Sequence, residues 1–320
     1  MNKKQQENLQ REAKSLLEEG KVSCIIGFEP GTIKFATTPI IIKDKKDVER
    51  LVVNHFITNN LAKQLLKLKG KAAIVAKGCD SRSIVSLIQD HKISRENIVI
   101  IGVACEGLID INKIQKLVGK ETDEIDDITR EGDKVIVTAG KEKKEFALKD
   151  VLYAHCLSCE TPTPKEYDNL LGEASSPPVD KAVGQAKIDE LDKMTPEQRW
   201  EFWNEQMQKC TRCYACRNVC PACYCERCFV EETEPQWVES VPNWQDNLMF
   251  QIVRNLHVAG RCTDCGNCER ACPVGIPLRT LSKKMCDIVD ATFQYKAGSD
   301  KNEIPLMAAY EQDEAEELIR

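Results

Sequence analysis

The feature that most constrains this chain is a cysteine-rich stretch at residues 210–272, in which one spacing occurs twice. Each copy has the pattern C-x2-C-x2-C-x3-C-P. The first copy consists of Cys210, Cys213, Cys216 and Cys220, and the second consists of Cys262, Cys265, Cys268 and Cys272. Because the complete pattern is repeated, including the closing Cys-Pro, these eight cysteines indicate one shared chemical purpose.

The spacing is that of two-cluster ferredoxins, in which the fourth cysteine of each copy binds the cluster of the other copy. Three thiolates at successive three-residue steps can surround one face of a cubane, while the fourth begins a helix that leads away. We therefore predict two [4Fe–4S] clusters with exchanged ligands. The first is assigned to Cys210, Cys213, Cys216 and Cys272, and the second to Cys262, Cys265, Cys268 and Cys220.

Two other uses of clustered cysteines fit this pattern less well. Structural zinc is usually bound by two Cys-x-x-Cys pairs, whereas here the cysteines form duplicated groups of three plus one. Disulfide frameworks belong to short secreted chains, and this chain has 320 residues and no apolar signal region near its start. Its seventeen cysteines therefore predict a reducing compartment, and we expect a cytoplasmic protein.

Charge and hydropathy exclude two broad classes of partner. A formal net charge of −6 provides no basic footprint for nucleic acid. No apolar run approaches the ~20 residues that a membrane-spanning helix needs, so we expect no membrane insertion. The length allows two domains with their own cores.

The first half of the chain has the alternating pattern of an α/β domain. The expected helices lie at residues 3–19, 47–68 and beyond residue 83. The expected strands lie at 22–27, 40–42, 72–76 and 98–103, and a hairpin is expected from 134–138 and 145–148. Cys24 lies within the first strand and is interpreted as a small core residue.

Four cysteines of this half form a candidate third site. Cys79 and Cys105 each follow the end of an expected strand, which is where ligands of α/β sheets gather. Cys156 and Cys159 add a Cys-x-x-Cys pair. A third [4Fe–4S] cluster is the favoured interpretation. A zinc site, and a redox dithiol at Cys156 and Cys159 beside separate buried thiols, are the alternatives.

The turn between the strand at 72–76 and the following helix is a candidate anion or cofactor site. Unpaired backbone N–H groups point outward at the start of a helix and attract phosphate. The candidate cofactor-binding residues are Lys77, Gly78, Ser81, Arg82 and Ser83. If a flavin is bound, Lys77 or Arg82 would supply positive charge.

The remaining cysteines and the domain boundaries complete this reading. Cys223, Cys225 and Cys228 lie between the two ladders, where a fourth cluster completed by Cys286 is one interpretation and a core role for Cys286 in a helix at 278–289 is the other.

The expected divisions are an α/β domain at 1–171, a linker at 172–194, a ferredoxin-like domain at 195–296 and an acidic tail at 297–320. The Thr-Pro-Glu-Gln sequence at 195–198 predicts a capped helix start.

These motifs together resemble the coenzyme F420 hydrogenase/dehydrogenase β-subunit family, and within it the β subunits of F420-dependent formate dehydrogenases. The resemblance covers roughly residues 20–290. It rests on Ala-Lys-x-Cys-Asp at 76–80, Ile-Gly-x-x-Cys-x-Gly at 101–107, the Cys156 and Cys159 pair, and the cysteine pattern at 210–228. It implies an α+β fold, with an N-terminal α/β domain like that of this family followed by a mostly helical two-cluster ferredoxin-like domain.

The resemblance also implies a function in electron transfer. In this family the N-terminal domain holds FAD and one [4Fe–4S] cluster, matched here by Cys79, Cys105, Cys156 and Cys159. We expect a relay subunit that passes single electrons between a catalytic partner and another iron–sulfur carrier. The partner would be a formate dehydrogenase α subunit, a hydrogenase or a reductase. The alternative is a flavin-bearing subunit that converts hydride from coenzyme F420 into single electrons; residues 10–20 lack the glycine pair that family members use near the flavin phosphate.

Overall fold

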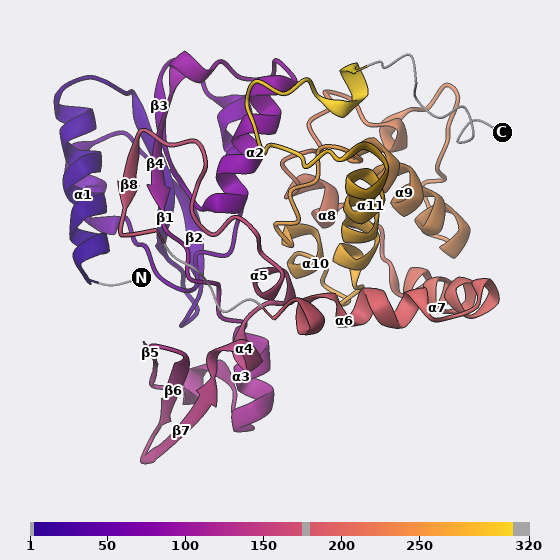
Figure 1. Ribbon diagram of the computed structural model, residues 1–320, viewed down its shortest axis with the longest axis horizontal. Helices are drawn as coiled ribbons and strands as arrows, with labels where there is room; N and C mark the ends of the chain where they lie inside the picture. The colour runs from indigo at the N-terminus through magenta and orange to yellow at the C-terminus, as the bar shows by residue number, and fades with distance from the viewer. Residues whose placement is uncertain (1–2, 175–179, 310–320) are drawn as a thin grey trace.

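The computed structural model describes residues 3–174 and 180–309, which form two regions side by side (Figure 1). The first half of the chain builds a twisted sheet with flanking helices, and residues after about 180 build a helical region. A smaller sheet with two helices projects from the first region. The architecture confirms the expected α+β class. Within these described residues, the helices are all too short or too polar to cross a membrane.

The main sheet has the strand order β2-β1-β3-β4-β8. Its strands are β1 (Cys24–Pro30), β2 (Thr37–Ile42), β3 (Ala72–Ala76), β4 (Ile98–Val103) and β8 (Asn169–Leu171). Strands β1, β3, β4 and β8 are parallel, and β2 joins β1 antiparallel at the edge. Because helices cover both faces, every residue of β3 is buried, as a continuous apolar run predicts.

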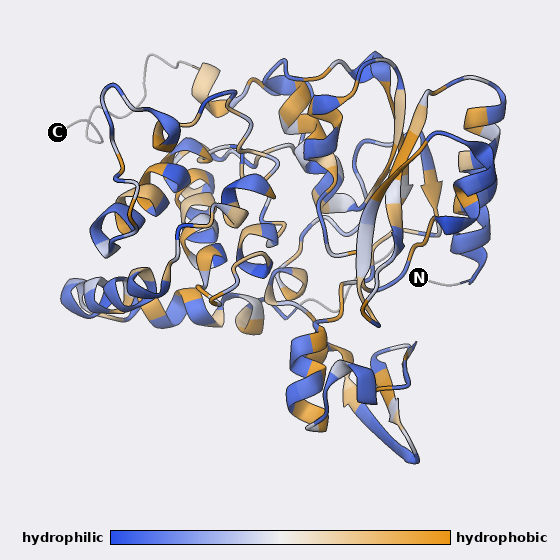
Figure 2. Ribbon diagram, turned by 180° about the vertical axis from the view of Figure 1, so that it is seen from behind, coloured by the Kyte–Doolittle hydropathy of each residue, from blue (hydrophilic) through white to orange (hydrophobic). Residues whose placement is uncertain are grey.

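Helix α1 (Lys3–Glu18) covers one face of this sheet and α2 (Gly78–Gln89) covers the other, on the side of the helical region (Figure 1). Helix α1 buries Leu9, Ala13 and Leu16 at helical spacing and turns its charged residues to solvent. Figure 2 shows the corresponding contrast between apolar central strands and a hydrophilic outer α1. The helix expected beyond residue 83 is confirmed as α2, which begins earlier, at Gly78.

The smaller sheet is an antiparallel meander of β5 (Asp127–Glu131), β6 (Lys134–Ala139) and β7 (Glu142–Ala147). Val135 and Val137 of β6 are buried against α3 (Ile111–Val118) and α4 (Leu148–Val151). The expected hairpin is confirmed as β6 and β7. Strand β5 was not expected, because its Asp, Arg and Glu residues give it little strand signal.

The helical region is built from one run of helices. They are α5 (Ala154–Leu157), α6 (Lys181–Asp192), α7 (Pro196–Lys209), α8 (Ala215–Asn218), α9 (Trp244–His257), α10 (Asn267–Arg270) and α11 (Leu278–Phe293). The capped start of α7 is confirmed, since the Thr195 hydroxyl accepts from the Gln198 N–H and the Gln198 side chain accepts from the Thr195 N–H. Short 3-10 turns link the elements elsewhere.

One expectation about local structure was wrong. Residues 47–68 do not form one helix; only the 3-10 turns η1 (Lys45–Arg50) and η2 (Ala62–Lys67) are helical. Between them, asparagine side chains bind nearby backbone N–H groups, as Asn54 does to Phe56 and Asn60 does to Ala62. Such local bonds compete with helix hydrogen bonds and favour turns.

The expected linker and tail also contain ordered structure. Residues 181–192 form α6, whose Ile188 and Leu191 are buried. Residues 297–309 return to α2, where Gln89 donates to the carbonyl oxygens of Asp300 and Glu303 at 2.9 and 2.7 Å. The acidic stretch 311–317 and residues 175–179 of the linker lie outside the described residues. The hydrophobic residues of α6 and the C-terminal return therefore tie the two regions together.

Candidate iron–sulfur sites

The structure brings together the four cysteines predicted to hold the first cluster. Cys210, Cys213, Cys216 and Cys272 line one small cavity, which Phe250 and Leu278 close from the apolar side. Burial raises the pKa of Cys210, and the nearby Cys216, Cys272 and Cys213 thiols raise it further. Cys272 comes from the second ladder, so the exchange of the fourth cysteine matches the observed placement.

The second predicted set is also grouped in space. Burial raises the pKa of Cys265 to about 12, and the next cause is the neighbouring Cys220 thiol. Burial also raises the pKa of Cys268, and the neighbouring Cys220, Cys262 and Cys265 raise it too. The positive charge of Arg254 acts in the opposite direction. Cys220 thus lies with the second ladder in space although it belongs to the first in sequence.

The two ladders share one backbone conformation. Arg212 and Tyr214 have positive φ angles of 52° and 58°, and Asp264 and Gly266, at the same positions of the second ladder, have 53° and 69°. These left-handed residues turn the chain so that successive cysteines face the same side. Glycine is required only at Gly266, because a Cβ there would lie 2.6 Å from Nδ1 of His155.

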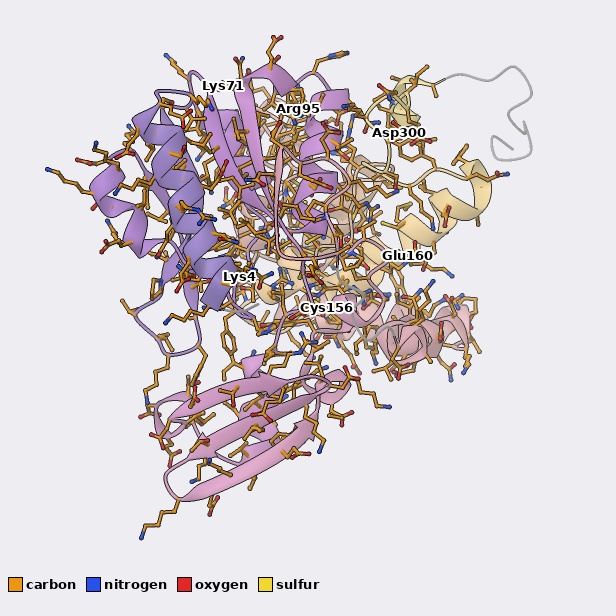
Figure 3. The ribbon with its side chains drawn as sticks, turned by 60° about the vertical axis from the view of Figure 1, so that its left-hand side comes forward. Lys4, Lys71, Arg95, Cys156, Glu160 and Asp300 are labelled. Carbon is orange, nitrogen blue, oxygen red and sulfur yellow. The ribbon has the colours of Figure 1, made fainter. Side chains whose placement is uncertain are left out.

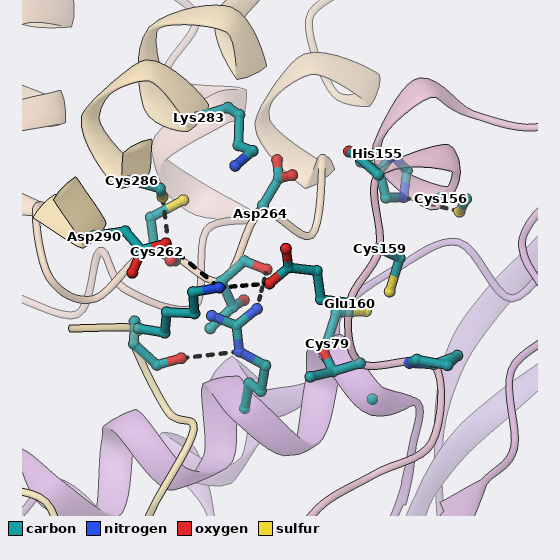
Figure 4. A pocket seen from close by; sticks show the side chains of 18 of the residues that line it. Cys79, His155, Cys156, Cys159, Glu160, Cys262, Asp264, Lys283, Cys286 and Asp290 are labelled. Carbon is teal, nitrogen blue, oxygen red and sulfur yellow. Dashed lines mark hydrogen bonds and ion pairs between the residues drawn. The ribbon is translucent and has the colours of Figure 1, made fainter. Parts of the chain in front are cut away.

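The third predicted set lines a cavity of about 260 Å³ between the two regions. Its cysteines are Cys79 at the start of α2, Cys105 after β4, Cys156 in α5 and Cys159 just beyond it. Figure 4 shows Cys79, Cys156 and Cys159 along one side of this cavity. In Figure 3, Cys156 lies at the opposite end of the sheet from Lys71, which precedes β3. The parallel β3 and β4 therefore deliver their following cysteines to one edge.

The three sets lie in a row. The cavity of the third set is also lined by Cys262 of the second set, and Cys265 contributes to the raised pKa of Cys79, after burial and Asp80. The second and first sets are joined through the exchanged cysteines. The order in space is therefore third, second and first, from the sheet edge to the outer helices.

The cysteine sets do not have the geometry of a single-ion site. In the described part of the chain, no three His, Cys, Asp or Glu side chains converge on a point as the ligands of a single ion would. In a [4Fe–4S] cluster each thiolate binds a different iron atom, so the four sulfurs surround the cluster instead of meeting at one ion. When bound, such a cluster accepts and donates single electrons. The cavities and the buried thiols fit this group.

His155 is a site residue that sequence reasoning did not identify. Its ring nitrogens lie 3.1 and 3.4 Å from Nη1 of Arg270, and Nε2 lies 3.5 Å from Sγ of Cys156. Burial, followed by the Arg270 charge, lowers the pKa of His155 well below its usual range. The ring is therefore neutral at neutral pH. Its position directly before Cys156 is the sequence feature that could have identified it as a site residue.

The candidate flavin turn does not fit a phosphate, because its side chains already have internal partners. The Lys77 ammonium is fully buried and lies 2.7 Å from Asp80 and 2.9 Å from the Asn59 carbonyl. A Cβ on Gly78 would lie 1.6 Å from the backbone oxygen of Thr161, so the segment around Thr161 covers this turn.

The rest of the set is engaged in the same way. Ser81 donates to the Glu166 carbonyl, Ser83 contacts Thr263, and Arg82 donates to the Ala297 and Thr263 carbonyls. The turn therefore joins the two regions, and we derive no step through a flavin held there.

The additional cysteines have different neighbours in the structure. Cys223 lies beside Cys220, with which its thiol is hydrogen-bonded, while Cys228 contacts Arg217 and Cys225 is exposed. Cys286 of α11 donates to the Cys262 carbonyl at 3.4 Å. The structure thus does not gather these residues into a fourth set of four.

Comparison with known proteins agrees with this geometry. Residues 206–276 match the model of the 4Fe-4S dicluster domain. The F420-dependent formate dehydrogenase subunit beta of Methanocaldococcus jannaschii is 25% identical, with 92% of each chain covered. The F420-dependent formate dehydrogenase 1 subunit beta of Methanococcus maripaludis is 26% identical, with 92% of this chain and 91% of that protein covered.

A solved structure of the F420-reducing [NiFe] hydrogenase complex from Methanosarcina barkeri includes a chain that is 14% identical. The match covers 62% of this chain and 84% of that chain, with a TM-score of 0.39. The sequence comparisons confirm the resemblance inferred from the cysteine motifs: this chain is similar over nearly its whole length to the β subunits of F420-dependent formate dehydrogenases and contains the pattern of a 4Fe-4S dicluster domain.

Proposed function

We propose that this chain is the iron–sulfur electron-transfer subunit of a larger redox complex of the formate dehydrogenase or hydrogenase type. The observation that carries the proposal is the row of three four-cysteine sets. Such a row accepts electrons at one end and releases them at the other. The exposed Cys213 marks the outer end, and the cavity beside Cys159 marks the inner end.

The residues around the row support a relay in preference to independent catalysis. Charged groups that line the cavity of the third set are paired with one another: Lys296 with Glu160 and Asp290, and Lys283 with Asp287. Figure 4 shows Glu160, Lys283 and Asp290 among the residues that line it. His155 is held neutral against Arg270 and borders the third set. The Lys296–Glu160 pair links the segment that carries Cys159 to the end of α11.

The relatives suggest the chemistry at the two ends of the relay. Both are named as β subunits of F420-dependent formate dehydrogenases, which makes a catalytic formate-oxidising subunit the first partner to test. A cytoplasmic complex remains our prediction from the cysteine content. The flavin-bearing alternative needs a phosphate site elsewhere than the turn at 77–83, since that turn is covered.

The proposal is tested by purifying the tagged chain from its native cells without oxygen and identifying the subunits that accompany it. We expect formate or H2 to reduce the clusters of the complex, seen as loss of their visible absorbance, with no flavin released by acid. Stoichiometric FAD or FMN would support the hydride-converting alternative. A complex whose clusters respond to neither donor, nor to added reduced F420, would contradict a relay of this type.

A further inference from the structure

Helix α9 buries a polar stripe beside its buried apolar residues Leu248 and Phe250. Asn247, Gln251, Arg254 and Asn255 are 1–4% exposed, although all are polar. Ile252 and Leu256 of the same helix are 46% and 53% exposed. An ordinary surface helix buries its apolar stripe, so a buried polar stripe implies that something polar lies beneath it.

The stripe faces the cysteine sets. The Asn247 amide donates to the carbonyl oxygen of Cys210 at 2.8 Å, which fixes the start of the first ladder. The Gln251 amide lies 3.6 Å from Sγ of Cys216 and donates toward it. The Gln251 side-chain oxygen in turn accepts from Nε of Arg254 at 3.0 Å. The helix therefore presents N–H groups and one cation to the sulfur atoms.

Arg254 lies between the first and second sets. Burial alone would lower the pKa of Arg254, but the nearby side chains of Cys268, Cys220 and Cys216 raise it above its usual value. Cys268 and Cys220 belong to the second set, and Cys216 belongs to the first. In addition, Nη2 of Arg254 is buried without a partner among the described residues. A buried donor of this kind is costly without an acceptor, and the cluster sulfurs would supply one.

We propose that Arg254 is a shared positioning cation, which stabilises the reduced states of both ferredoxin-type clusters by its fixed positive charge and its free N–H donor. This inference rests on the proposed function, because the clusters must be present. Reduction adds one negative charge to a cluster. Nearby charge and hydrogen bonds to sulfur are the protein's means of setting that potential, and arginine stays charged throughout the accessible pH range.

The test is a redox titration of the anaerobically purified chain and its variants, followed by electron paramagnetic resonance. In Arg254→Met the equilibrium constant for reducing each ferredoxin-type cluster should fall about tenfold or more, a shift of about 59 mV to more negative potential for one electron. Arg254→Lys should recover part of this shift. The cluster of Cys79, Cys105, Cys156 and Cys159 should not move.

Arg261→Gln is the matched control. Arg261 directly precedes Cys262, but its guanidinium lies 3.1 Å from Asp90 and donates to the His257 carbonyl, so its charge is already neutralised. We expect potentials close to wild type. If Arg254→Met keeps its iron and its potentials, or shifts one cluster alone, the inference is wrong and the proposed function stands.

Loss of a cluster does not remove the test. If Arg254→Met loses iron, the potentials of Arg254→Lys decide whether the inference holds. Values close to wild type in Arg254→Lys support the shared charge. Loss of iron in Arg254→Lys as well assigns Arg254 to folding and overturns the inference. Absence of iron from the wild-type chain would refute the proposed function itself.

Discussion

Replacing Cys220 with serine removes the cluster held by Cys262, Cys265 and Cys268 and lowers the iron content by about four atoms per chain. Cys220 belongs to the first ladder in sequence, yet it is the largest neighbouring-thiol influence on the pKa of Cys265, after burial. The variant should keep the cluster of Cys210, Cys213, Cys216 and Cys272. Iron analysis and electron paramagnetic resonance measure both outcomes.

The neighbouring Cys223 makes a second variant necessary. Because its thiol is hydrogen-bonded to that of Cys220, it is placed to substitute as a ligand. Cys220→Ser with Cys223→Ser removes this rescue. Cys225→Ser is the matched control, since Cys225 is exposed and should change nothing. Loss of the first cluster with survival of the second would show that the exchanged pairing is wrong.

The second large effect is expected at Arg279, which joins α11 to the segments of α5 and α6. It is 6% exposed and binds both carboxylate oxygens of Asp264, at 2.7 and 2.8 Å. It also donates to the Gly184 carbonyl at 3.0 Å and to the Ser158 hydroxyl at 2.7 Å. Arg279→Met leaves Asp264 without this partner, so the free energy of unfolding should fall by about 3–5 kcal/mol.

Lys284→Met provides the control on the same helix. Lys284 pairs with Asp192 of α6, but both side chains are 45% exposed, and such pairs contribute about 0–1 kcal/mol. Denaturant unfolding followed by circular dichroism compares the two variants. Equal losses of stability would contradict the view that the buried Arg279 contacts, instead of surface charge, hold α11 against α5 and α6.

The parts of the fold that sequence predicted are those whose signal is local. Strands β3 and β4 have continuous apolar runs, and α7 has its capping box, so each was placed to the residue or nearly so. The cysteine spacing also led to the exchanged grouping that the structure shows. These elements do not depend on knowing the tertiary neighbours of their side chains.

The parts that failed depend on distant contacts. Residues 47–68 have helical spacing, but their side chains and backbone bond to turns and to α1, as the Val53 N–H does to Gln6. The turn at 77–83 has the local form of an anion site, but Asp80 and the Thr161 segment occupy it. The polar residues 247, 251, 254 and 255 follow helical periodicity, but the sequence does not show that this stripe, with Arg254 in it, faces inward.

The measurement that tests the central claim most directly is the iron and acid-labile sulfide content of the anaerobically purified wild-type chain. Three four-cysteine sets predict about twelve iron atoms and as many sulfides per chain. About eight of each would remove the cluster assigned to Cys79, Cys105, Cys156 and Cys159. Zinc in place of iron, with no sulfide, would contradict the iron–sulfur relay altogether.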